Sequence, residues 1–298
     1  MIAEQVPVAP SLVSGAASHI GFRTPDVATL TRFYVDVVGL EVHDQLAGGG
    51  GMRLGWGRGH HVLDLVAGEA GLDHVGFEVR EPGAVETLAS VLAAHGTPTR
   101  PLDVASTGVT GFEVADPDGN RIQLHGRIDR GGEGKADIGH RPIRFQHVTF
   151  GTADVAGMVG FYTEQLGFQV SDRMGDVFTW LRSNREHHTV AVVDVGHGGD
   201  IDHYSYDVAR WDDFKVWCDR LAAQDVPVTW GPGRHGPGNN LFIMFDDPDG
   251  RHIELSAEME RFWDDRATYP PRQWRACPET VNFWGGQIPS WRHTQREA

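Results

Sequence analysis

One short segment of the chain concentrates residues that can bind a metal or move a proton. Residues 187–208, HHTVAVVDVGHGGDIDHYSYDV, contain His187, His188, His197 and His203. Apolar and polar residues alternate through most of this segment, which is typical of a β-strand with one face turned inward. Imidazole is a common metal ligand and titrates near neutral pH. Because the chain has 16 histidines against 26 Lys plus Arg, metal chemistry is the first hypothesis that the sequence raises.

The composition narrows the classes of protein in which these histidines could act. Two cysteines, Cys218 and Cys277, in 298 residues argue against a disulfide framework or a thiolate metal site, and indicate a reducing, cytoplasmic compartment. The net charge of -15 lacks the basic surface that binding to phosphates needs, so nucleic acid is not an expected partner. No membrane-length apolar run and no secretion signal is found, so we expect a protein that neither spans a membrane nor is exported.

An internal repeat shows which elements must position the histidines. DVATLTRFYVDVVGLEV, from Asp26, recurs as DVAGMVGFYTEQLGFQV from Asp154, and DPDGNRIQL, from Asp116, recurs as DPDGRHIEL from Asp247. Such self-similarity is the mark of a duplicated unit. The sequence therefore predicts an N-terminal domain over residues 18–126, a Gly-rich linker over 127–143, a C-terminal domain over 144–257 and a Trp/Pro-rich extension over 258–298.

Each half divides again into two smaller units of the same pattern. In each unit a short strand is followed by an amphipathic helix and then by several short strands. In the first unit the helix has Leu30, Phe33 and Val37 on one face. In the second unit of each half, an Asp-Pro-Asp-Gly turn joins the last two strands. Helices that interrupt meanders of strands indicate an α+β class with mainly antiparallel sheets.

Three residues occupy matching strand positions in the C-terminal half. His147 lies in the first strand of the third unit, His203 in the first strand of the fourth unit, and Glu254 in the last strand. If the two units curve around one cleft, two imidazoles and one carboxylate converge and leave several metal positions open. This is the ligand set of non-haem Fe(II) oxygenases. A single histidine at a strand start is more often structural, so the set carries the argument and no single member does.

The chain resembles the type I extradiol catecholic dioxygenases of the vicinal oxygen chelate superfamily. The resemblance covers residues 18–258 and is most specific in four C-terminal stretches: HVTFGT, REHHTVAVV, IDHYSYDV and GPGRHGPGNNLFIMFDDPDGRHIEL. It implies four βαβββ modules paired into two similar domains. It also implies an enzyme of aromatic-compound catabolism that forms a homo-oligomer. The implied reaction uses O2 to cleave the ring of a catechol-type substrate beside its vicinal diol.

The resemblance also assigns roles to individual residues. It places the metal ligands at His147, His203 and Glu254, with Fe(II) as the expected metal and Mn(II) as the alternative. The acid–base histidine of the family falls on His188, and a second histidine near the metal falls on His235.

Two further residues, Met244 and Trp180, are expected to lie at the substrate pocket, and Met244 departs from the family pattern. Met244 stands where the family usually has a tyrosine that hydrogen-bonds the substrate, and a thioether cannot donate a hydrogen bond. We expect Met244 and Trp180 to belong to the substrate pocket, Trp180 as an apolar wall for the ring.

The N-terminal half carries a partial copy of the same set. His19 and His74 match His147 and His203, and the pair at 60 and 61 matches the pair at 187 and 188, but Gln123 replaces the glutamate. A neutral amide binds Fe(II) more weakly than a carboxylate, so we expect this half to hold no metal.

Two other functions remain open on the sequence alone. The first is an isomerase or lyase of the same superfamily with a different divalent metal, which would need the three ligands but not His188 and His235. The second is a small-molecule binding protein on this scaffold, which would need no metal. We further expect residues 258–298 to wrap the C-terminal domain, covering the pocket or joining subunits, and His187, His197 and His252 to be solvent or turn residues.

Overall fold

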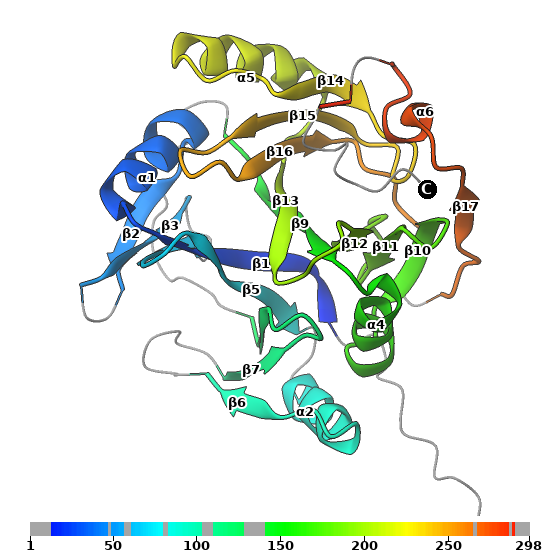
Figure 1. Cartoon of the computed structure of the whole chain (residues 1–298). Coiled ribbons are helices and arrows are strands. Elements are labelled where there is room, and N and C mark those ends of the chain that lie inside the picture. The colour runs from blue at the N-terminus through cyan, green and yellow to red at the C-terminus, as the bar shows by residue number, and fades with distance from the viewer. Residues whose placement is uncertain are drawn as a thin grey trace, which may run out of the picture.

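The computed structural model describes residues 13–46, 49–56, 61–79, 83–102, 110–127, 141–264, 267–285 and 288–289. Its strands form two separate sheets of eight and nine strands, one from each half of the chain. Figure 1 shows the N-terminal half in blue and cyan and the C-terminal half in green to orange. No helix in the described part of the chain is long and apolar enough to cross a membrane. The linker residues 128–140 and His60 lie outside the described residues.

The N-terminal sheet has the strand order β2-β3-β4-β1-β5-β8-β7-β6. It is built from two units, each a strand, a helix and three more strands. The first unit contains β1 (Val13–Thr24), α1 (Val27–Phe33) with the π-helical turn η1 (Tyr34–Val38), β2 (Glu41–Gln45), β3 (Gly51–Gly55) and β4 (His61–Ala67). The second contains β5 (Gly71–Val79), α2 (Ala84–Ala94), β6 (Thr99–Pro101), β7 (Gly111–Ala115) and β8 (Arg121–His125).

The C-terminal sheet repeats this plan in the order β14-β15-β16-β13-β9-β12-β11-β10-β17. Its first unit contains β9 (Arg144–Thr152), α4 (Val155–Gly160) with η2 (Phe161–Gln165), β10 (Gln169–Met174), β11 (Phe178–Arg182) and β12 (Val190–Asp194). Its second contains β13 (Asp200–Asp207), α5 (Trp211–Ala223), β14 (Trp230–Arg234), β15 (Leu241–Asp246) and β16 (His252–Ala257). The extension adds β17 (Arg272–Trp274) and α6 (Pro278–Val281). The predicted α+β fold of four βαβββ modules is therefore confirmed.

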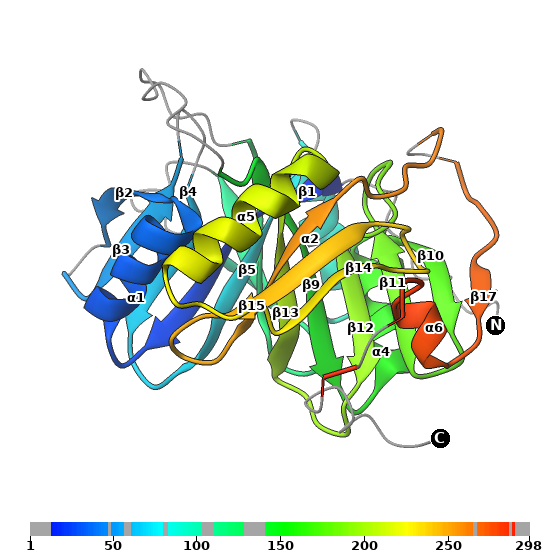
Figure 2. The ribbon, with the colours of Figure 1, turned by 90° about the horizontal axis from the view of Figure 1, so that it is seen from above.

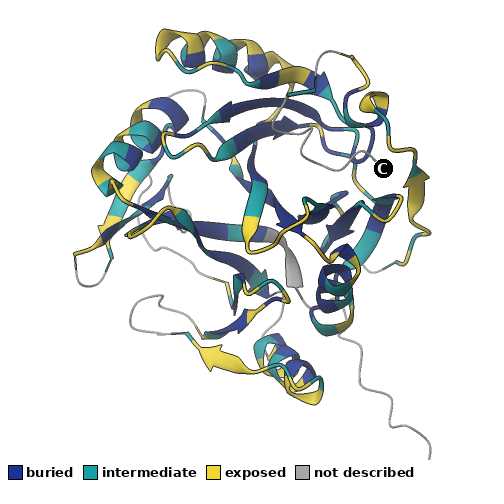
Figure 3. Ribbon diagram, viewed as in Figure 1, coloured by how far each residue is buried: buried dark blue, intermediate teal, exposed yellow. Residues whose placement is uncertain are grey.

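The pairing of strands explains how each module closes. Most neighbours are antiparallel, but the first and last strands of every module pair in parallel: β1 with β4, β5 with β8, β9 with β12 and β13 with β16. The two modules of a half then join through their first strands, β1 with β5 and β9 with β13. Residues on the first strands therefore lie at the centre of each sheet, and all but the first residue of β9 are buried. Figure 3 shows buried ribbon through most of the two sheets.

The repeated motifs also hold the two halves together. Tyr34, from the N-terminal half, donates a hydrogen bond to Asp247 of the C-terminal DPDG turn at 3.0 Å, and Tyr162 donates to Asp116 of the N-terminal turn at 3.4 Å. Figures 1 and 2 both show α1 and α5 side by side where the halves meet, and Arg220 of α5 donates to a backbone oxygen of this region. The duplicated sequence thus supplies matching contacts in both directions across the join.

The described part of the extension packs against the C-terminal half. β17 pairs in parallel with β10 and becomes the last strand of the nine-stranded sheet. Figure 2 shows β17 and α6 along that edge.

Candidate metal centre

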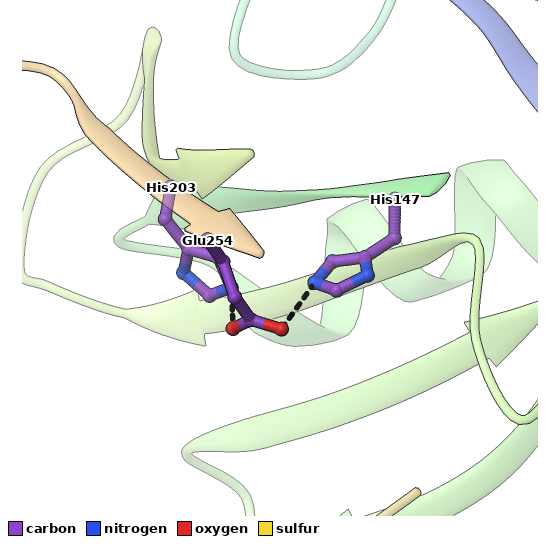
Figure 4. A group of neighbouring side chains, drawn as sticks. All are labelled: His147, His203 and Glu254. Carbon is purple, nitrogen blue, oxygen red and sulfur yellow. Dashed lines mark ion pairs between the residues drawn. The ribbon is translucent and has the colours of Figure 1, made fainter. Parts of the chain in front are cut away.

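Three neighbouring strands at the centre of the C-terminal sheet bring the predicted ligands together. His147 comes from β9, His203 from β13 and Glu254 from β16, and these strands are adjacent in the sheet. Ser205 pairs with both His147 and Glu254 across the ladder, which puts the two residues level with each other. Figure 4 shows the three side chains converging on one point.

The geometry of the three side chains fits a divalent metal. Nε2 of His147 lies 3.8 Å from Oε1 of Glu254, and Nε2 of His203 lies 3.6 Å from Oε2. All three ligand atoms lie within 4.8 Å of one another, and all three residues are buried. Nitrogen and oxygen ligands stand about 2 Å from a bound metal, so neighbouring ligand atoms about 3 to 4 Å apart are what such an ion requires. His147, His203 and Glu254 therefore form a candidate metal site.

Outer contacts turn the correct ligand atoms toward this point. Nδ1 of His147 faces Oε1 of Gln146 at 3.0 Å, and Nδ1 of His203 faces Oδ1 of Asp202 at 2.5 Å. Each Nδ1–H donates to an oxygen, which leaves Nε2 without a hydrogen and therefore as the nitrogen that can bind a metal. Asn240 donates from Nδ2 to Oε1 of Glu254 at 3.2 Å. The ligands are thus oriented before any metal arrives.

The electrostatics of the site keep Glu254 and His147 in their metal-binding protonation states. Burial raises the pKa of Glu254, but the hydrogen bond from His235 and the nearby imidazoles outweigh it and hold the pKa at about 2. Burial lowers the pKa of His147 to about 3, against the attraction of Glu254. An ionised carboxylate and a neutral imidazole are the forms that bind a metal ion.

His188 and His235 both border the metal site. The ring of His188 lies 4.3 Å from that of His147, centroid to centroid. Burial, and then the charges of the neighbouring histidines, lower the pKa of His188 well below its ordinary value. His235 donates from Nδ1 to the carbonyl oxygen of Val281 at 2.6 Å, and its Nε2 lies 3.4 Å from Oε2 of Glu254. The structure therefore brings together all five residues that the sequence singled out for chemistry.

A small cavity of about 30 Å³ lies over the ligands, room for about two water molecules. Trp180 lines it and stacks on Phe178 with ring centroids 4.0 Å apart. Met244 lies opposite Glu254 in the β15–β16 register and packs with Trp230 and Phe242, behind the cavity wall. The residues that line the cavity are His147, Thr149, Phe178, Trp180, His188, His203, Trp230, His235, Pro237, Glu254 and Val281.

The N-terminal counterparts are also buried, but they are arranged differently. Nε2 of His19 faces Oε1 of Gln123 at 3.2 Å. Nε2 of His74 lies 3.8 Å from Oδ2 of Asp64, which is also 3.4 Å from Nε2 of His61. Among the described residues, only the C-terminal set brings three such ligand atoms within 4.8 Å of one another.

His61 gives the N-terminal half an expected pH dependence. Burial lowers its pKa from 6.5 to about 4, against the pull of Asp64. Between these two pH values the unfolded chain binds a proton that the folded chain does not, so stability falls as pH drops through this window. The slope from this one group is at most about 1.4 kcal/mol per pH unit. Urea midpoints of the metal-free protein between pH 7 and 4 should therefore vary less steeply in His61→Gln than in the wild type; equal slopes would contradict this account.

Several residues of the site were not identified from the sequence. Gln146, Asp202 and Asn240 contact the ligands, and only the folded structure reveals them. The expectation that His187 is a solvent or turn residue is wrong, because His187 is fully buried and its Nε2 lies 2.9 Å from Oδ2 of Asp172. The repeat gave no signal for this contact, because Asp44, the residue that aligns with Asp172, is exposed.

Comparisons with known proteins agree with this geometry. The family model described as Glyoxalase/Bleomycin resistance protein/Dioxygenase superfamily matches residues 16–124 and 144–255. Metapyrocatechase 2 of Cupriavidus necator is 28% identical over 320 residues, covering 99% of this chain and 96% of the relative. The manganese-dependent 2,3-dihydroxybiphenyl 1,2-dioxygenase of Geobacillus genomosp. 3 is 27% identical over 267 residues, covering 80% of this chain and 83% of the relative.

A solved structure extends the likeness to three dimensions. The Mn(II)-bound glyoxalase from Novosphingobium aromaticivorans superposes with a TM-score of 0.85 at 28% identity, covering 96% of this chain and 95% of that one. The relatives' names confirm the resemblance to extradiol dioxygenases that the C-terminal motifs indicated. The family match covers most of both halves, and the chain therefore belongs to the Glyoxalase/Bleomycin resistance protein/Dioxygenase superfamily.

Proposed function

We propose that the protein is a metal-dependent extradiol dioxygenase that opens the ring of a catechol-type substrate with O2, in the breakdown of aromatic compounds. The observation that carries the proposal is one buried site in which a two-histidine, one-carboxylate set borders two further histidines, His188 and His235. Three protein ligands leave adjacent positions for the two oxygens of a diol and for O2. The catechol dioxygenase names of two relatives that cover most of this chain support the same activity.

The metal, when bound, supplies Lewis acidity that makes the diol hydroxyls easier to deprotonate and brings substrate and O2 together. The residues of the chain supply the rest. His188, neutral and buried against His147, can accept the proton of the second hydroxyl and return it later in the reaction. Nδ1–H of His235 already donates to the carbonyl of Val281, so as an imidazolium His235 can also donate from Nε2 to a developing negative oxygen beside Glu254. The aromatic wall of Phe178 and Trp180 can hold the ring and exclude water.

We propose Fe(II) as the working metal. A two-histidine, one-carboxylate set is the usual Fe(II) site of oxygenases, but the same ligands accept Mn(II). Mn(II) is the second candidate, because one relative is named as manganese-dependent and a structural neighbour was solved with Mn(II) bound. Metal analysis of protein purified without oxygen, followed by reconstitution with each metal, distinguishes the two. Zinc or nickel in the active preparation would instead favour an isomerase or lyase.

The substrate that we propose is a catechol without a carboxylate group. Among the described residues that line the cavity there is no lysine or arginine, and Glu254 already places one negative charge there. Burying an unpaired carboxylate in such a site costs several kcal/mol. We therefore expect kcat/KM for 3-methylcatechol to exceed that for 2,3-dihydroxybenzoate by about 100-fold or more.

The test is oxygen uptake together with the absorbance of the ring-opened product, measured over a panel of catechols. The two probes, 3-methylcatechol and 2,3-dihydroxybenzoate, are compared at the same metal loading. Equal or better turnover of the carboxylated compound would refute the proposed preference, whereas no oxygen uptake with any catechol would refute the proposed activity. Tight catechol binding without turnover or a metal requirement would favour the binding-protein alternative.

We also propose that the protein is cytoplasmic and forms a homo-oligomer. Each subunit would have an N-terminal domain over residues 18–126, a C-terminal domain over 144–257 and the extension over 258–298. Both cysteines are unpaired thiols, which fits a reducing compartment. Light scattering on the purified full-length chain measures the number of subunits.

A further inference from the structure

A line of polar contacts runs from the extension to His188. Nδ1 of His188 faces Nδ1 of His187 at 3.0 Å, and Nε2 of His187 lies 2.9 Å from Oδ2 of Asp172. All three residues are buried, His187 and Asp172 completely. Resting on the proposed function, we propose that Asp172 and His187 are positioning residues that set which ring nitrogen of His188 carries the proton, with β17 of the extension holding Asp172 in place.

The extension fixes the carboxylate at the outer end of this line. Asp172 on β10 pairs with Arg272 on β17 in the parallel register. Arg272 donates to Oδ1 from Nε at 2.8 Å and to Oδ2 from Nη2 at 3.0 Å, while Trp274 donates to Oδ2 from Nε1 at 2.7 Å. Burial raises the pKa of Asp172, but contacts with His187, Arg272 and Trp274 outweigh it, and the pKa is lowered. Asp172 is therefore an ionised acceptor. Arg272 also pairs with Glu260, at 2.7 Å, but the side chain of Glu260 is 33% exposed to water whereas Asp172 is fully buried.

The carboxylate decides the protonation pattern of His187. A carboxylate can only accept, so Nε2 of His187 must carry a proton where it meets Asp172. The N–H is not well aligned with Oδ2, but this Nε2 has no other hydrogen-bond partner among the described residues. Asp172 already accepts two hydrogen bonds from Arg272 and one from Trp274, and a charged imidazole at His187 would be removed from water completely, so His187 is taken to be neutral. Its Nδ1 is therefore bare and can only accept.

The protonation pattern of His187 in turn decides which ring nitrogen of His188 carries the hydrogen. Where two ring nitrogens face each other at 3.0 Å, one must carry a hydrogen and the other must not. Since Nδ1 of His187 accepts, Nδ1 of His188 donates. Nε2 of His188, on the other side of the ring, is then bare, and His188 lines the cavity over the metal site. This is the tautomer that a base needs if it is to accept a proton from a substrate hydroxyl.

Asp172→Leu and Asp172→Asn together test the first step. Oδ2 of Asp172 faces His187 and also accepts from Trp274 and from Nη2 of Arg272, so an asparagine keeps its amide oxygen at this place and still accepts from Nε2 of His187. A leucine cannot accept, and the proton of His187 is then no longer held on Nε2. We expect kcat for ring cleavage to fall about 10- to 100-fold in Asp172→Leu, as for other outer contacts of metal sites, and less than about threefold in Asp172→Asn, with KM and metal content changed less than about twofold in both.

The His187→Asn variant distinguishes a positioning role of Asp172 from a purely structural one. In His187→Asn the shorter side chain no longer reaches Asp172, and its oxygen can accept from Nδ1–H of His188 whatever residue stands at 172. Adding Asp172→Leu in this background should change kcat by less than about threefold. Loss of the Arg272 ion pair should lower the thermal midpoint by a similar amount in both backgrounds. An equal loss of kcat in both backgrounds would show that Asp172 acts only on the fold.

The tautomer can also be read without any turnover. We expect ¹⁵N NMR of histidine-labelled, full-length protein loaded with diamagnetic Zn(II) to show His188 with a protonated Nδ1 and a bare Nε2. Assignment by comparison with His188→Asn identifies its signals. A protonated Nε2 in the wild type would overturn the proposal even if every variant failed to fold. If no catechol is turned over but the expected tautomer is present, the proposed activity fails and the positioning by Asp172 and His187 stands.

Discussion

Glu254→Ala is expected to lower the metal content from about one ion per chain to less than about a tenth, and to abolish oxygen uptake with catechols. Glu254 is the only carboxylate of the three ligands, and its two oxygens face His147 and His203 at 3.8 and 3.6 Å. Without it, two neutral imidazoles remain, and the charge of a divalent ion is not balanced in a buried site. Elemental analysis of protein purified without oxygen measures the loss.

The duplicated half supplies a matched control for this variant. Gln123 occupies the position of Glu254 in the N-terminal sheet, on β8 beside β5. Gln123→Ala should leave both the metal content and the oxygen uptake of the protein at their wild-type values. If the metal content instead survived Glu254→Ala and fell in Gln123→Ala, the metal would bind in the N-terminal half. That result would refute His147, His203 and Glu254 as the ligands.

The second large effect is expected at His188. His188→Asn removes the imidazole that borders His147 but leaves the three ligands intact. We expect kcat for ring cleavage to fall about 10²- to 10⁴-fold, the range typical of a lost general base, while the metal content stays at about one ion per chain. Catechol should still bind, because the diol binds at the metal and the aromatic wall is unchanged. Rapid-mixing kinetics with and without O2 separate binding from ring opening.

His61→Asn is the matched control here, since His61 is the N-terminal counterpart of His188. His61 is buried beside Asp64 in the N-terminal sheet, whereas the three ligands lie in the C-terminal sheet. Its loss should therefore alter stability but not kcat at neutral pH. If His188→Asn instead lost its metal, the histidine would be acting on the metal site itself. A kcat near that of the wild type would remove His188 from the proton transfers.

The sequence alone determined the plan of the molecule. Repeated segments from Asp26 and Asp154 predict one architecture twice, because the same apolar spacing and the same Asp cap must form the same helix start. In the structure Asp26 and Asp154 both accept from the backbone N–H three residues on. His147, His203 and Glu254 were also predictable as a set. Each lies on a strand whose place in the repeat is recognisable, and two histidines with one carboxylate form a known ligand set, although a single histidine there would more often be structural.

Contacts between distant segments were decided only by the tertiary structure. Nothing in the spacing of residues 258–298 indicates that Arg272 and Trp274 meet Asp172, 100 and 102 residues earlier in the chain. The same holds for Val281, whose carbonyl oxygen orients His235. These contacts depend on β17 joining the sheet edge beside β10, and strand pairing of this range leaves no local pattern in the sequence.

His187 shows the physical reason for this division most clearly. Its residue type and its place next to His188 do not distinguish a surface residue from a buried one, because a strand end can turn either way. Phe262 of the extension stacks on its ring, Glu260 accepts a hydrogen bond from its backbone N–H, and its carboxylate partner lies on another strand. Local sequence sets the periodicity of each element and hence the face on which a ligand lies, whereas the environment of a buried polar group is set by whichever distant segment covers it.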